Sequence, residues 1–252
     1  MLPAYQAHHP KYDRFLPHLS KYIEKSETII DVGANVGDTL AGMAEINSKS
    51  SYVCIEPDDS FFKFLEINLN RIKSIRTDLN VCTIKSLVGK NISDVTLEGH
   101  GGTKHAALSN EGGVKSLSLD SLLSKLPHKK IRLLKTDVDG FDYDVIDSAT
   151  SLIRDHKPII FFECHCDFEY QKSGYKNMLS SLQSEGYLDW TIFDNYGEVI
   201  ARTTSIDTIV QLLNYVWNQN IGAATRTISY FDILAVQQCD SELINRVLAE
   251  FH

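Results

Sequence analysis

The chain has 252 residues, of which 43% are hydrophobic and 23% are charged, a composition typical of a globular protein with a sizeable apolar core. Its formal net charge of −8 argues against a nucleic-acid backbone as the main partner, because phosphate binding needs a basic surface. No apolar run is long enough to span a bilayer, and residues 1–17 lack the apolar centre of a secretion signal.

The cysteines bear on the compartment of the protein. They number five, and their positions show no repeated metal-binding spacing. An odd number of cysteines without a secretion signal favours a reducing compartment, so we expect a cytoplasmic protein.

Strand-like apolar segments alternate with helical patterns along most of the chain. The expected strands, in chain order, are 28–32, 51–56, 81–88, 131–137, 158–164, 188–193, 199–202 and 228–236. Strands separated by helices predict right-handed crossovers and a doubly wound, mostly parallel α/β sheet, with antiparallel strands late in the chain. We expect a single domain over 1–252, with an N-terminal extension at 1–25 and a C-terminal helix-strand-helix unit at 203–252.

Residues 89–118 differ from the rest of the chain. They are rich in Gly, Ser, Asn and Thr, with short alternating segments at 95–97 and 114–119, and we interpret them as a loop-and-hairpin insertion. Such an insertion could act as a lid that brings His105 onto a substrate. An ordinary surface loop is the alternative interpretation.

A glycine-bearing turn follows the first expected strand, with the sequence Asp-Val-Gly-Ala-Asn-Val-Gly-Asp at 31–38. Ligands of open α/β sheets bind beyond the carboxyl ends of the strands, where such a turn lets the backbone approach closely. The spacing is G-x-N-x-G, whereas a dinucleotide-binding turn needs G-x-G-x-x-G. The pattern favours S-adenosylmethionine, whose amino and carboxylate groups need acceptors and donors. The expected contacts in this turn are Asp31, Gly33, Ala34, Asn35, Gly37 and Asp38.

The ends of the next two strands supply further cofactor contacts. Glu56 ends the second strand, where an acidic side chain can accept hydrogen bonds from two ribose hydroxyls, and Pro57 then ends the strand. Ser86 and Leu87 end the third expected strand, where an adenine ring would lie. A solvated glutamate and a core leucine are the alternative interpretations of Glu56 and Leu87.

The sequence resembles the FkbM family of methyltransferases over about residues 26–200. The matching motifs are the turn at 31–38, Ile-Glu-Pro at 55–57, Leu-Ser-Leu-Asp-Ser-Leu-Leu at 117–123, Leu-Lys-Thr-Asp-Val-Asp-Gly-Phe-Asp at 134–142, and the segments 158–165 and 230–236. Family members commonly carry glutamates where this chain has Asp139 and Asp142. The resemblance implies a class I, Rossmann-like methyltransferase fold and methyl transfer to a hydroxyl oxygen of a glycan, sugar or secondary metabolite.

Methyl transfer to an alcohol requires alignment of the acceptor oxygen and removal of its proton. Asp137, at the end of the fourth strand, is expected to contact the donor amine or orient the acceptor, and Asp139 is a candidate base. Alternation along the fifth strand places Glu163 and His165 on one face, Glu163 as a substrate contact and His165 as a second candidate base. Helix capping by Asp139 and a structural role for His165 are the alternatives.

Other activities stay open at this point. Asp137, Glu163 and His165 could converge on Mg²⁺, but the carboxylates look scattered and we expect no metal. An NAD-dependent oxidoreductase or epimerase is the alternative enzyme, and a donor-binding module without catalysis is the alternative outside enzymes. The identity of the small-molecule or glycan acceptor is open, as is assembly into a homo-oligomer through the apolar segment 243–251.

Overall fold

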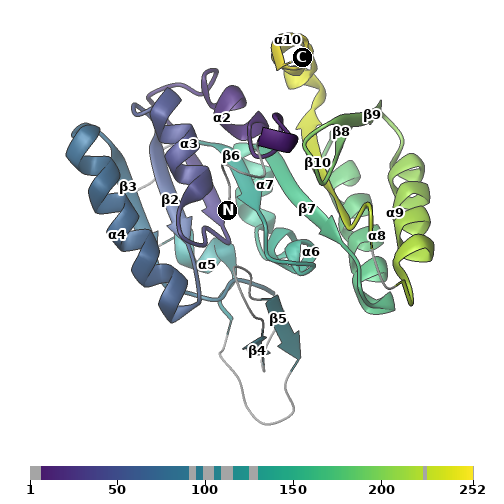
Figure 1. Cartoon of the computed structure of the whole chain (residues 1–252). Coiled ribbons are helices and arrows are strands. Elements are labelled where there is room, and N and C mark those ends of the chain that lie inside the picture. Colours follow the sequence, from purple (N-terminus) through teal and green to yellow (C-terminus); the bar gives the residue numbers. More distant parts are fainter. Residues whose placement is uncertain are drawn as a thin grey trace.

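A computed structural model describes residues 7–90, 95–98, 105–108, 116–124, 130–223 and 226–251. Its centre is an eight-stranded sheet with the strand order β3-β2-β1-β6-β7-β10-β8-β9 (Figure 1). The strands are β1 (Glu27–Val32), β2 (Ser51–Ile55), β3 (Asn80–Ile84), β6 (Lys130–Thr136), β7 (Ile159–His165), β8 (Tyr187–Asp194), β9 (Val199–Thr203) and β10 (Tyr230–Gln237).

The strand directions follow the sequence prediction. The first five strands of the spatial order, β3 to β7, run parallel to their neighbours. Strand β10 is antiparallel to both β7 and β8, and β9 is antiparallel to β8. The expected doubly wound, mostly parallel sheet with late antiparallel strands is therefore confirmed.

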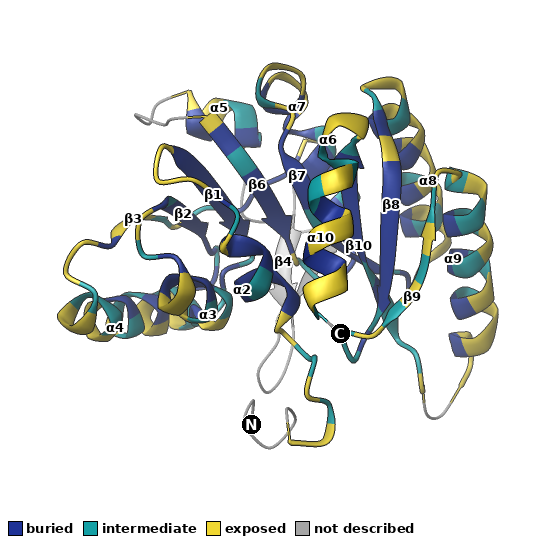
Figure 2. Cartoon of the chain, turned by 90° about the horizontal axis from the view of Figure 1, so that it is seen from above, coloured by how far each residue is buried: buried dark blue, intermediate teal, exposed yellow. Residues whose placement is uncertain are grey.

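Helices cover both faces of the sheet, because successive strand residues point to opposite sides. In β1, Ile29 packs with one group of helices and Ile30 with the other. The first group is α2 (Phe15–Ser20), α3 (Asp38–Ile46), α4 (Asp59–Ile75) and α10 (Ser241–Phe251). The second group is α5 (Leu119–Leu123), α6 (Asp142–Asp147), α7 (Thr150–His156), α8 (Glu169–Ser184) and α9 (Ile206–Asn220). Figure 2 shows buried strands between helices whose outer sides are exposed.

Side-chain caps fix where two of these helices begin. Asp58 precedes α4 and accepts hydrogen bonds from the amides of Ser60 and Phe61. Asp120 of α5 accepts from the amides of Ser151 and Leu152, in the first turn of α7. An acid at a helix start satisfies amides that have no partner within the helix and complements the helix dipole.

Some boundaries differ from those expected. Strand β3 ends at Ile84, so Ser86 and Leu87 lie in the loop that follows it rather than at a strand end. The insertion contains an antiparallel pair, β4 (Val95–Glu98) with β5 (His105–Leu108), whereas the second segment was expected at 114–119. Leu117 instead forms an isolated bridge with Val88, which ties the end of the insertion back to its start.

The C-terminal part also contains a short 3₁₀ helix, η1 (Gln238–Asp240), between β10 and α10. Across the ranges given above, no helix combines the length and apolarity needed to cross a membrane.

Candidate functional site

The glycine-bearing turn lies between the ends of β2 and β6. The amides of Gly33 and Ala34 donate to the carbonyl of Ile55, at 3.0 and 3.1 Å. Gly33 has a φ of 76°, and a Cβ there would lie 2.0 Å from the carbonyl oxygen of Asp137. Only glycine combines this backbone conformation with so close an approach.

Glu56 lies directly against this turn. Its carboxylate is buried and accepts from the amides of Asn35 and Asp58, each at 2.9 Å. Burial raises the pKa of Glu56, while these two hydrogen bonds oppose the rise. The turn and the Glu56 carboxylate thus form one connected structure, held by backbone amides.

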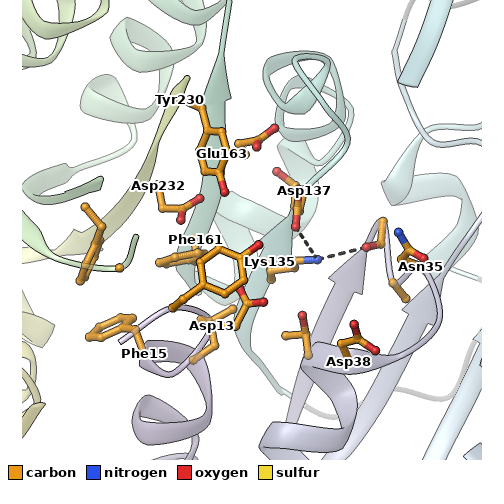
Figure 3. A pocket seen from close by; sticks show the side chains of 18 of the residues that line it. Asp13, Phe15, Asn35, Asp38, Lys135, Asp137, Phe161, Glu163, Tyr230 and Asp232 are labelled. Atoms are coloured by element: carbon orange, nitrogen blue, oxygen red, sulfur yellow. Dashed lines mark hydrogen bonds and ion pairs between the residues drawn. The ribbon is translucent and has the colours of Figure 1, made fainter. Parts of the chain in front are cut away.

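A cleft of about 670 Å³ opens beyond the carboxyl ends of β1, β6 and β7, within the usual size range for small-molecule sites (Figure 3). The turn contributes part of its lining, and the ends of β6, β7 and β10 contribute the opposite part. The lining residues of the turn and the following helix are Gly33, Ala34, Asn35, Val36, Asp38 and Thr39.

Lys135 forms the floor of this cleft, although the sequence analysis gave it no role. Its ammonium lies 2.9 Å from Asp31 Oδ1 and donates to the carbonyl of Gly33 at 3.1 Å. It also lies 3.4 Å from Asp137 Oδ2, on the other side of the cleft floor (Figure 3). Burial alone would lower the pKa of Lys135, but Asp31 and Asp137 raise it overall. The available sequence signal was a lysine directly after the apolar pair Leu133 and Leu134 in a strand, because a buried ammonium needs a partner.

Asp31 does not line the cleft, contrary to its expected role as a direct contact. Its side chain is 1% exposed and lies beneath Lys135, on the face of the sheet that packs against α2 and α3. Burial raises the pKa of Asp31, and the Lys135 ammonium opposes the rise. Asp31 therefore acts on the cleft through Lys135.

Carboxylates line the cleft on both sides. The acidic residues that line the cleft are Asp13, Asp38, Asp137, Asp139, Glu163 and Asp232, beside the two lysines Lys11 and Lys135. Burial, and then the charge of Asp137, raises the pKa of Asp13 to about 6. The same two causes raise the pKa values of Glu163 and Asp232. This crowding of carboxylates favours positively charged ligands.

His165 lies next to Glu163 on the same face of β7, with its Nδ1 3.9 Å from Glu163 Oε2. Its Nε2 lies 3.1 Å from Asp167 Oδ2, and Arg226 donates to the other oxygen of Asp167 at 2.6 Å. Burial would raise the pKa of Asp167, but His165 and Arg226 lower it overall. The imidazole is thus oriented by a carboxylate that is itself held by an arginine.

Residues 31–188 match the methyltransferase FkbM domain. The chain belongs to the FkbM methyltransferase family. The family and the fold expected from the sequence motifs are therefore confirmed. No curated protein matches the sequence.

Two solved methyltransferases with TM-scores of 0.50 show the same fold at low identity. An O-methyltransferase from Bacillus cereus in complex with SAH is 12% identical, with a TM-score of 0.50, over 89% of this chain and 80% of that one. The O-methyltransferase TomG from Streptomyces achromogenes, in complex with SAM, is 10% identical, with a TM-score of 0.50, over 89% and 79%. A methyltransferase FkbM from Methylobacillus flagellatus KT is 14% identical with a TM-score of 0.45, and this FkbM-family chain covers 44% of it.

The family match leaves out part of the cleft. Residues 11–13, 15 and 16 precede it, and Phe193, Gly197, Tyr230 and Asp232 follow it. Gly197 approaches the N-terminal segment so closely that a Cβ would lie 2.5 Å from the Lys11 carbonyl oxygen. Residues 1–25, expected to be an N-terminal extension, therefore contribute to the cleft.

Several expected site residues stand outside the cleft lining. Gly37 precedes α3 in a left-handed conformation, and Leu87 packs against Phe141. The other candidates that do not line the cleft are Glu56, Pro57, Ser86 and His165. His105 lies in β5, and its side chain is outside the described part of the structure.

Proposed function

We propose that this FkbM-family chain is an S-adenosylmethionine-dependent O-methyltransferase acting on a hydroxyl of a small molecule or glycan. The observation that carries the proposal is the carboxylate-rich cleft at the Gly33–Asp38 turn. The donor brings a sulfonium and an ammonium, two cations that such a cleft attracts. The SAM and SAH complexes of proteins with this fold support the choice of donor.

The same charges disfavour the NAD-dependent alternative. A dinucleotide would place a doubly charged pyrophosphate at the turn, close to Asp38 and across from Asp137. Pyrophosphate sites offer backbone amides and cations. Here the ammonium of Lys135 is already committed to Asp31, Asp137 and the Gly33 carbonyl.

The donor contacts follow from the turn. We assign the methionine end to the turn backbone with Asp38 and Asp137, and the ribose to Glu56. The adenine would lie toward Ser86 and Leu87, as the sequence analysis expected. The oxygens of Glu56 each accept one backbone amide, and a carboxylate oxygen has room for a second donor such as a hydroxyl.

The reaction itself is an in-line displacement. A bond forms between the acceptor oxygen and the methyl carbon while the bond from that carbon to sulfur breaks, and sulfur keeps the electron pair. The acceptor proton must leave, and the candidate bases are Asp137 and Asp139, which line the cleft, and His165, which lies next to Glu163 outside the lining. The cleft aligns the two reactants, and this alignment supplies much of the rate enhancement.

Calorimetric titration of the full chain with S-adenosylmethionine, and separately with NAD, tests the donor. We expect micromolar donor affinity, about −7 to −8 kcal/mol, lost in Glu56→Ala. Asp59→Asn, which changes an exposed acid on the neighbouring helix, is the matched control and should bind normally. NAD binding without donor binding would overturn the proposal.

A screen with methyl-labelled donor against sugars, polyols and phenols tests the acceptor class. Label transfer to an oxygen supports O-methylation, and transfer only to nitrogen or carbon overturns it. Donor binding with no transfer to any acceptor favours a binding module without catalysis. We also propose a cytoplasmic location, which the five unpaired cysteines support.

A further inference from the structure

Three side chains with metal-binding atoms meet where β6 and β7 end. Asp139, Glu163 and His165 each offer one ligand atom, and these atoms all lie within 4.8 Å of one another. Glu163 and His165 share a face of β7, and Asp139 follows the adjacent parallel strand β6. Asp139 and Glu163 also line the cleft. From the sequence, Asp137 was the expected partner of Glu163 and His165, and no metal was expected.

The buried carboxylate of Glu163 has an oxygen whose hydrogen-bonding capacity no described residue uses. The residue is 5% exposed, and its buried Oε2 has no hydrogen-bond partner within the described part of the chain. The atom that faces it is His165 Nδ1, at 3.9 Å, beyond hydrogen-bond distance. A buried carboxylate oxygen without a partner is costly, so a cation between these atoms would satisfy both.

The surroundings of His165 set which nitrogen is available. A carboxylate only accepts hydrogen bonds, so the contact of Nε2 with Asp167 places the proton of the neutral ring on Nε2. The lone pair is then on Nδ1, the nitrogen directed at Glu163. Metal-binding histidines commonly donate their other N–H to a carboxylate in this way.

From this arrangement we propose that Asp139, Glu163 and His165 bind one divalent metal ion. Ligands bound at about 2.1 Å can lie up to about 4.2 Å apart, so small side-chain rotations suffice to close the observed group around an ion. Two carboxylates balance the double charge. Oxygen ligands with one imidazole suit Mn²⁺ or a similar first-row ion, and leave positions open for an acceptor.

The role of the metal rests on the proposed function, whereas its binding does not. A hydroxyl bound to the ion is a stronger acid, so its proton leaves more easily and its oxygen is held in place for the methyl group. Asp137, which lines the same cleft, is then placed to take that proton. In this arrangement Asp139 and His165 are metal ligands rather than bases.

Electron paramagnetic resonance of the full chain with Mn²⁺ tests the site, because the signal of the free hydrated ion falls as the ion binds. We expect one saturable site per chain, with affinity at least tenfold weaker in Glu163→Gln and in His165→Ala. Asp167→Asn should weaken binding about tenfold or more through the orientation of the imidazole. Asp155→Asn changes an exposed acid near the end of α7, where β7 begins, whereas the candidate ligands lie where β7 ends; it is the matched control and should leave Mn²⁺ affinity unchanged.

Calorimetry with S-adenosylmethionine on the same variants shows that they remain folded and separates the two proposals. Saturable Mn²⁺ binding that depends on Glu163 and His165 supports the site even if no methyl acceptor is found. Absence of saturable binding, or equal affinity in the parent and both ligand variants, overturns it. Methyl transfer that persists undiminished in a chelator, without saturable Mn²⁺ binding, overturns the metal site and retains the methyltransferase.

Discussion

The ion pair between Lys135 and Asp31 gives the sharpest stability prediction. Lys135→Met would leave Asp31, 1% exposed, without the ammonium that lies 2.9 Å from its Oδ1. Removing one partner of a buried ion pair costs about 3–5 kcal/mol, because the other charge stays buried. At about 2–4 °C per kcal/mol for a chain of this size, we expect the melting temperature to fall by about 6–20 °C.

The pH dependence of this loss has a definite sign. In Lys135→Met, burial raises the pKa of Asp31 without an ammonium to oppose it. An acid whose folded-state pKa exceeds its unfolded value of about 3.9 loses stability as the pH rises from the unfolded pKa to the folded pKa. The deficit relative to the parent should therefore be larger at about pH 7 than at about pH 4.

The double variant Asp31→Asn/Lys135→Met is the matched control. It removes both charges and should recover at least half of the lost stability. Urea unfolding, followed by the fluorescence of the fully buried Trp190, measures all three proteins. A single variant within about 0.5 kcal/mol of the parent, or a double variant no more stable than the single one, would refute the reasoning.

Three further predictions concern the turn and the helix starts. Gly33→Ala would place a Cβ 2.0 Å from the Asp137 carbonyl oxygen and should lower the melting temperature strongly. Gly222 has a similar φ but open space around it, so Gly222→Ala is the control and should lower the melting temperature far less; equal losses would contradict the steric argument. Burial raises the pKa of Asp142 to about 7, so the parent should lose stability between about pH 4 and pH 7. Relative to the parent, the free energy of unfolding of Asp142→Asn, measured by urea titration, should increase over that pH range. A constant difference between variant and parent across the range would contradict this. Asp120→Ala should cost about 1–2 kcal/mol by unfolding, because two amides of α7 lose their cap, with donor affinity unchanged by calorimetry.

The sequence alone predicted the parts of the site that depend on local backbone chemistry. Gly33 was expected to permit a close approach, and the structure shows that approach to the Asp137 carbonyl. Glu56 was expected at the end of the second strand as a cofactor contact, and its carboxylate accepts the Asn35 amide of the turn. These features depend on the local backbone conformation, which the residue types of a short motif are enough to predict.

Features that depend on packing between segments far apart in the sequence were not predicted. Asp31 was expected to contact the cofactor, but strand alternation directs it to the α2 and α3 face, where Lys135 covers it. Segment 11–16 has no periodic pattern, and only its packing against Gly197 and the sheet edge makes it a wall of the cleft. The candidate metal ligands include Asp139, which follows β6 with a left-handed φ of 51°, rather than Asp137, which the sequence had suggested.

The residues that form the cleft therefore come from two parts of the chain. The turn, Lys135 and the candidate metal ligands lie within residues 31–188, the part that matches the family. Tyr12, Asp13, Tyr230 and Asp232 lie outside that part yet line the same cleft. Under the proposed function, the first group would bind the donor and support methyl transfer, and we propose that the second group shapes the acceptor site. On this proposal, substitutions at Tyr12 or Tyr230 should change which acceptor is methylated more than they change donor affinity, and a loss of donor affinity without a change of acceptor would contradict it.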